Sequence, residues 1–306
     1  MAGSNNANSV GDSCHSQPEK PTRETSMRNL ILTAVILAMP SMAAAGDGWL
    51  TKCPYSHSNN DDPIRFPGQK GVSHLHDFFG ARTTNYQSTY SSMVASPTTC
   101  GTTADKSGYW TPALYKNGVK INPSGSYDGR SVREQFYYRD NNYVSDTKVE
   151  PFPSNFRMIQ GYAMATSLSD ANAHGAKWGS EMYWGCSDNK PDGKFTSPVN
   201  CATGIITLHV SFPTCWDGVT VDGDAIAAGH VKFSSGGKCP TGFSRQLPRL
   251  LLRQEYPVGT SSAGITLASG APYTAHADFW NTWDMPTLSG LVTKCLNGDK
   301  DCGTDP

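Results

Sequence analysis

Cysteine spacing is the feature that most restricts how this chain can fold. Of nine cysteines, Cys14 precedes an apolar segment at 27–45 and eight follow it. An even number behind such a segment is typical of a domain held by disulfides in an oxidising compartment. The absence of any C-x-x-C pair disfavours a cysteine zinc site. Eight cysteines allow about a hundred connectivities, and the neighbour-pairing hypothesis predicts Cys53–Cys100, Cys186–Cys201, Cys215–Cys239 and Cys295–Cys302.

Residues 27–45 have the three parts of a secretory signal peptide. A basic start at Arg28 is followed by an apolar run from Leu30 to Met39 and by small residues ending at Ala45. The apolar run is shorter than the about 20 residues that span a bilayer. We therefore predict cleavage near Ala45 and a secreted, extracellular or periplasmic protein. Residues 1–26 are expected to be a non-structural extension, with Met27 the true start.

The remaining chain, 46–306, is expected to form a single domain. No linker or charge run divides it, and no second apolar stretch is long enough to span a membrane. The formal net charge is −1, without a basic patch. This charge balance disfavours nucleic acid as a partner.

Short, turn-punctuated apolar runs predict a mainly β fold. These runs are bounded by Gly, Pro, Asn and Asp, and they cover 131–138, 156–165, 204–212, 230–233 and 249–256. One short helix is expected within 284–295, where Pro286 stands early, as helix starts allow. With 30 Gly and 20 Pro, the pattern favours a β-sandwich or jelly-roll-like domain with few short helices and long loops pinned by disulfides.

Two histidine-containing pairs carry the strongest chemical signal. In extended chain, residues two apart point to one face, so His74 with His76, and His276 with Asp278, would each present two polar groups together. Imidazole titrates near neutral pH and binds metals, and a carboxylate can orient it. These four residues are candidate catalytic groups. The three histidines are also candidate ligands of Cu or Zn.

Further candidates come from a turn aspartate, one arginine and several aromatic residues. Asp217 follows Cys215, so a disulfide would fix its carboxylate for catalysis, although an Asp-Gly turn can simply cap its own loop. Arg65 is a candidate for binding a substrate's negative charge. Aromatic faces that stack on sugar rings predict substrate contacts at Tyr109, Trp110, Trp216 and Trp280, whereas the alternative is that these rings fill the core.

Several motifs together resemble the DUF1996 family, a domain of unknown function. The resemblance runs in order through nearly all of Cys53–Cys295, and its most specific segments are Asp62-Pro63-Ile64, Ser73–Gly80, Tyr109–Tyr115, Phe212–Gly218 and His276–Phe279. What the resemblance implies is a secreted domain of fungi and bacteria, sometimes joined to carbohydrate-binding modules. It implies no particular reaction.

Three functions remain open from the sequence. The first is a secreted hydrolase or lyase acting on extracellular polysaccharide through the His and Asp residues. The second is a secreted protein that binds Cu or Zn through His74, His76 and His276. The third is a non-catalytic domain that binds cell-wall polysaccharide. No cofactor is required by the sequence, and extracellular polysaccharide is the expected partner in the first and third cases.

Overall fold

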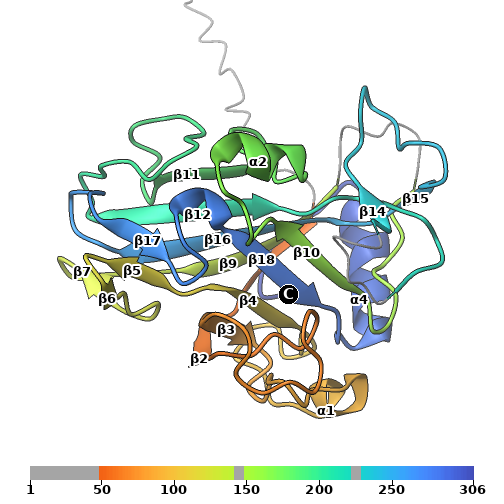
Figure 1. Cartoon of the computed structure of the whole chain (residues 1–306). Coiled ribbons are helices and arrows are strands. Elements are labelled where there is room, and N and C mark those ends of the chain that lie inside the picture. Colours follow the sequence, from red (N-terminus) through yellow and green to blue (C-terminus); the bar gives the residue numbers. More distant parts are fainter. Residues whose placement is uncertain (1–47, 141–147, 222–228) are drawn as a thin grey trace, which may run out of the picture. The chain divides into compact units, whose positions relative to one another are not determined.

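Two large β-sheets pack face to face in the computed structural model (Figure 1), which describes residues 48–140, 148–221 and 229–306. These residues belong to one compact unit, Ala44–Pro306. The six-stranded sheet has the order β11 (Met182–Cys186), β12 (Ile205–Ser211), β16 (Arg249–Pro257), β9 (Glu134–Arg139), β1 (Gly48–Lys52) and β19 (Asp301–Thr304). The five-stranded sheet has the order β10 (Arg157–Gly161), β18 (His276–Trp280), β4 (Gly108–Pro112), β3 (His76–Gly80) and β2 (Tyr55–Asn59). Neighbouring strands are antiparallel except for the parallel pair β1–β19.

Smaller elements decorate these two sheets. A three-stranded sheet is formed by β14 (Val231–Lys232), β13 (Cys215–Trp216) and β15 (Arg245–Gln246), and another by β17 (Ile265–Leu267), β5 (Leu114–Lys116) and β6 (Val119–Lys120). A hairpin pairs β7 (Ser126–Tyr127) with β8 (Arg130–Ser131). The helical elements are short: α1 (Tyr90–Val94), α2 (Leu168–Ala173), α4 (Met285–Leu291), the 3-10 turn η1 (Pro272–Thr274) and the π-helical turn η2 (Val292–Leu296).

Alternation along the five-stranded sheet separates the core from a second face. Phe79, Tyr109 and Phe279 point toward the six-stranded sheet and are fully buried. The ring of Tyr109 lies 4.0 Å from that of Phe136 on β9, measured between centroids. Truncating such a buried ring to alanine costs about 3–5 kcal/mol. The inner face of this sheet is therefore committed to packing.

The outer face of the five-stranded sheet carries the intervening residues. Phe78, Trp110 and Trp280 form a separate apolar cluster there with Ile64, which lies in the segment between β2 and β3. That segment covers part of the outer face through Ile64, and the chain between β3 and β4, which includes α1, covers another part through Met93. His76 and His276, at the starts of β3 and β18, lie on this face because they are two residues from Phe78 and four from Trp280.

The predictions of fold class and disulfides are confirmed. The chain is mainly β, with few short helices. All four cysteine pairs expected from neighbour order are formed. The expected helix is α4, whose N-cap residue Asp284 accepts a hydrogen bond from the Thr287 amide. The predicted extension and signal peptide, 1–45, lie outside the described residues.

The compartment is indicated by the covalent structure. Four disulfides are consistent with an extracellular protein, because such bonds persist in oxidising compartments. Within the described ranges, no helix has the length and apolarity needed to cross a bilayer.

A buried chain of polar groups joins the two sheets. Asp105 accepts hydrogen bonds from the Ser107 amide and from the hydroxyl of Tyr109, 2.7 Å away. The Tyr109 hydroxyl also contacts the hydroxyl of Tyr138 on β9, which accepts a hydrogen bond from the Trp283 indole. Burial raises the pKa of Asp105 to about 7, and the hydrogen bonds from Tyr109 and Ser107 oppose that rise. The folded protein therefore binds a proton that the unfolded chain releases near pH 4.

We predict that Asp105 weakens folding as the pH rises. A folded-state pKa above the unfolded value means that stability falls between about pH 4 and pH 7. Because one unit of pKa is worth about 1.4 kcal/mol, Asp105→Asn should reduce this loss by about 2–4 kcal/mol. Urea unfolding at pH 4.5 and pH 7.5 measures the effect, and Asp192→Asn, at an exposed position, is the control. Equal pH dependence in wild type and Asp105→Asn would contradict the prediction.

Candidate metal centre

Three histidines from two distant parts of the chain meet on the outer face of the five-stranded sheet. The Nε2 atom of His276 lies 3.2 Å from Nε2 of His74 and 3.2 Å from Nε2 of His76. One ring nitrogen from each of the three histidines lies within 4.8 Å of one from each of the others. The convergence expected from the two histidine-containing pairs is present in the fold.

Strand register explains why the imidazoles meet. β4 lies between β3 and β18, and Pro112 of β4 is the register partner of His76. Asp278 pairs with Trp110 across the other edge of β4. Extending that antiparallel register by two residues places Pro112 opposite His276 as well. The two imidazoles thus stand in one row on either side of a small side chain, which leaves space above Pro112 for their rings to approach.

Backbone carbonyls fix the orientation of two of the rings. His76 Nδ1 lies 3.0 Å from the carbonyl oxygen of Asp61, and His276 Nδ1 lies 3.0 Å from that of Thr274. A carbonyl can only accept, so both Nδ1 atoms carry the hydrogen. In the neutral rings both Nε2 atoms then present unshared electron pairs.

Two electron pairs facing each other across 3.2 Å repel unless a positive charge lies between them. Three imidazole nitrogens around a tetrahedral Zn²⁺ at its usual bond length of about 2.0–2.1 Å are separated by about 3.3 Å. The observed 3.2 Å separations match this spacing. Histidines that bind a metal through one ring nitrogen usually donate the N–H of the other to an acceptor such as a backbone carbonyl, as His76 and His276 do here. The arrangement is suited to a divalent cation.

Burial keeps these imidazoles neutral. It lowers the pKa of His74 to about 4, and together with the nearby His74 it lowers the pKa of His276 to about 3. The pKa of His76 falls well below 6.5, first through burial and then through His74 and His276. Groups with such pKa values are poor general bases at neutral pH but are ready as ligands.

Asp278 adds a carboxyl group beside the three histidines. Its Oδ2 lies 3.9 Å from His276 Nε2, and the side chain is fully buried. Neither carboxyl oxygen has a hydrogen-bond partner among the described residues. Burial, and then the charge of Asp62, raise the pKa of Asp278, while Arg65 opposes the rise. A buried carboxyl without a donor is costly, so Asp278 is placed for something other than stability.

The centre opens into a cavity of about 220 Å³, which we call the histidine cavity. Its lining includes His74, His276, Asp278 and Arg65. Asp62 fixes the backbone at Arg65, because its Oδ1 accepts hydrogen bonds from the backbone amides of Ile64 and Arg65, each at 3.0 Å. The prediction that Arg65 lies with the histidine set agrees with this position; its substrate role remains a proposal.

Four predicted substrate-binding aromatics lie elsewhere. Tyr109 and Trp110 are fully buried, and Trp280 and Trp216 are 1% and 9% exposed. Tyr109 packs in the main core, Trp110 and Trp280 pack in the cluster outside the five-stranded sheet, and Trp216 packs edge-on against Phe156. These four rings therefore pack in the interior, as the alternative to sugar stacking predicted, because their faces are covered.

Asp217 is also not part of the histidine cavity. Its Oδ1 accepts hydrogen bonds from the amides of Val219 and Thr220, so the side chain caps its own turn. Desolvation raises the pKa of Asp217, but these hydrogen bonds, together with the charge of His230, outweigh it, so that the pKa is lowered. Of the two aspartates predicted to be catalytic, only Asp278 lines the histidine cavity.

Several contributors to the site were not predicted from the sequence. Asp61 and Thr274 act through backbone carbonyls, for which residue type gives no signal. Tyr162 and Met164 line the histidine cavity from the segment after β10, and no local pattern pointed to them. The exposure of Met164, 73%, becomes informative only once the fold places it at the cavity.

The described residues thus form a two-sheet β protein with a three-histidine centre at the surface of one sheet. The family model described as "Domain of unknown function (DUF1996)" matches residues 62–283, and the chain belongs to this family. The matched range contains all three histidines, Arg65 and Asp278. Comparison with curated proteins found no match, and comparison with solved structures found none either.

We predict that Asp278→Asn stabilises the metal-free protein at pH 7. The substitution removes a group that must either stay protonated or carry an uncompensated buried charge, and relief of about 1–3 kcal/mol is expected. Urea unfolding in the presence of a chelator measures the change. Asp217→Asn is the matched control, since an amide oxygen can accept the same two hydrogen bonds. A destabilised Asp278→Asn variant with a normal control would assign Asp278 a structural role instead.

Proposed function

We propose that this chain is a secreted, metal-dependent enzyme that cleaves extracellular polysaccharide, with Zn²⁺ held by His74, His76 and His276. The observation that carries the proposal is the 3.2 Å approach of the Nε2 atoms, two of them from rings whose Nδ1 hydrogens are held by carbonyls. The predicted signal peptide at 27–45 and the four disulfides support secretion.

The arrangement favours a catalytic ion over a structural one. Structural zinc sites close four protein ligands around the metal, whereas catalytic sites use three and leave a position for water or substrate. Here three nitrogens converge at the wall of a cavity. The fourth position would face that cavity, next to Asp278 and within the space that Arg65 borders.

Two cleavage reactions use this set of groups. A cation held by the three histidines would polarise a water molecule and lower its pKa. In hydrolysis, Asp278 would accept a proton from water as the water oxygen bonds to the anomeric carbon, and would give that proton to the departing sugar oxygen as its bond breaks. In elimination, Arg65 would hold a sugar carboxylate, whose charge a cation at the histidines would help to neutralise, while Asp278 would remove the proton from the neighbouring carbon. A carbon–carbon double bond then forms as the bond to the departing sugar oxygen breaks, and that oxygen is protonated. A bound cation favours the ionised form of Asp278 that both reactions require.

Three imidazoles also suit Cu²⁺, so the identity of the metal is part of the test. We predict about one equivalent of Zn per chain in protein purified without chelator and dialysed against metal-free buffer. His76→Ala should hold less than a tenth of an equivalent, because it removes one of three ligands. His209→Ala, which removes a buried histidine on the six-stranded sheet, should retain the metal. Elemental analysis of the three proteins decides, and a wild type that binds neither Zn nor Cu would overturn the proposal.

Activity is predicted on a panel of soluble polysaccharides, observed by new reducing ends and by absorbance of unsaturated uronates. New reducing ends alone indicate hydrolysis, and both signals together indicate elimination. His76→Ala should lower the rate at least 100-fold, since the metal is lost, while its melting temperature after chelation stays near that of chelated wild type. His209→Ala should keep the rate.

Polysaccharide binding without turnover across the panel by metal-loaded wild type would favour the non-catalytic alternative. A large drop in the melting temperature of chelated His76→Ala would assign the histidine to the fold.

A further inference from the structure

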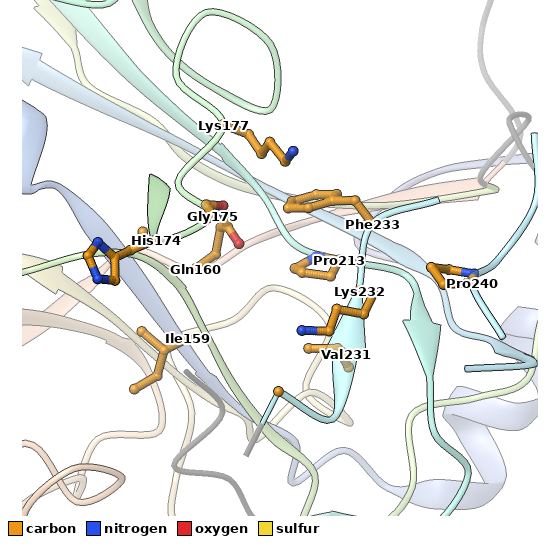
Figure 2. A pocket seen from close by; sticks show the side chains of 12 residues that line it. Ile159, Gln160, His174, Gly175, Lys177, Pro213, Val231, Lys232, Phe233 and Pro240 are labelled. Carbon is orange, nitrogen blue, oxygen red and sulfur yellow. The ribbon is translucent and has the colours of Figure 1, made fainter. Parts of the chain in front are cut away.

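A second cavity, of about 300 Å³, shares the lining residue Ile159 with the histidine cavity, and we call it the lysine cavity. Figure 2 shows Lys177 and Lys232 reaching it from different elements, with Phe233 and Pro213 between them in this view. No aspartate or glutamate is among its described lining residues, and neither ammonium group forms a salt bridge within the described parts of the chain. The cavity therefore offers two cations to a ligand.

The backbone at Lys177 is held rigidly. Its φ is +59°, a conformation uncommon for a residue other than glycine. Its carbonyl accepts hydrogen bonds from the amides of Ser180, Glu181 and Met182 at 3.0–3.2 Å. The carbonyls of Gly175 and Ala176 accept hydrogen bonds from the side-chain amide of the buried Gln160, at 3.1 and 3.0 Å. The loop is fixed while the exposed ammonium group is left available.

Lys232 is fixed from the opposite side by covalent structure. It stands on β14 as the register partner of Cys215 on β13, and Cys215 is bonded to Cys239. Its ammonium group lies 5.7 Å from the centre of the Phe243 ring, a weak contact that an anion can supplement. Because both backbone positions are anchored, a ligand has to order only the two lysine side chains and not the loops that carry them.

The lysine cavity adjoins the histidine cavity. Ile159 lines both. Tyr162, which lines the histidine cavity, stacks on the ring of His174, which lines the lysine cavity, with centroids 4.1 Å apart. His174 is itself paired with Asp170. The positive charges in the lysine cavity without a carboxylate partner among the described residues are therefore those of Lys177 and Lys232. A ligand that follows this surface passes from the three histidines and Arg65 across Ile159 to the two lysines.

We propose that the lysine cavity is a distant subsite for the negatively charged sugars of an acidic polysaccharide whose cleaved bond lies at the histidine centre. This inference rests on the proposed function and names its substrate class. A polyanion places charges at both ends of such a path, near Arg65 and the ion at one end and near Lys177 and Lys232 at the other. Half-buried Phe233 and the two cavity prolines offer apolar contact to the ring faces between charges.

The test is calorimetric binding of a hexamer of galacturonic acid in the Asp278→Asn background, which keeps the three histidines and blocks turnover. We expect Lys177→Gln with Lys232→Gln to weaken binding at least tenfold and to reduce the dependence of affinity on salt. Lys190→Gln with Lys300→Gln, at two exposed positions, removes the same net charge and should change binding less than twofold. The neutral hexamer of glucose should bind at least tenfold more weakly than the acidic one.

Equal losses in both double variants, or equal binding of the acidic and neutral hexamers, would overturn the subsite. Metal content is measured in the same preparations, so the two proposals fail separately. Metal-free protein that still binds the acidic hexamer through the two lysines would leave the subsite intact and remove the metal enzyme. Metal-loaded protein that binds the acidic hexamer equally well with and without the two lysines would overturn the subsite and leave the metal enzyme intact.

Discussion

Alternation of side chains across the five-stranded sheet is the constraint on which both the fold and the site depend. On β18 the inward Phe279 packs in the aromatic core, while the outward His276 and Asp278 border the histidine cavity. A slip of one residue in register would exchange these faces. Imidazoles would then enter the core, and phenyl rings would face the cavity. The same strand register therefore specifies packing and chemistry together.

The site is built from groups that the fold must stabilise at some cost. Three imidazoles with lowered pKa values and a carboxyl without donors gather within one small volume. The aromatic core between the sheets and the four disulfides offset this cost, since each supplies stability away from the cavity. Separation of the stabilising core from the polar centre by a single sheet allows both to exist in a domain of this size.

Much of the framework could be predicted from the sequence because its causes are local. Neighbouring cysteines gave the four pairs, and alternating apolar runs located strands such as β12 and β16. Period-two spacing predicted that the members of each pair face one side, and the metal-site hypothesis required His74 and His76 to meet His276, as they do. The role of a residue that depends on contacts between distant segments could not be predicted from local spacing. Trp110 and Trp280 resemble sugar-stacking residues in sequence, and only their covered faces show that they pack in an apolar cluster.

The orientation of the imidazoles follows from the path of the main chain and not from particular side chains. The acceptors at Asp61 and Thr274 are peptide oxygens, which every amino acid possesses. Other residues at these two positions could therefore preserve the protonation pattern of the rings, provided that the chain kept its course. His74 and the Asp61 carbonyl both belong to the segment between β2 and β3, so this segment must keep its course for the three nitrogen donors to meet. The part of the border formed by Tyr162 and Met164 lies in a different segment, after β10, and changes there could alter specificity without displacing the nitrogen donors.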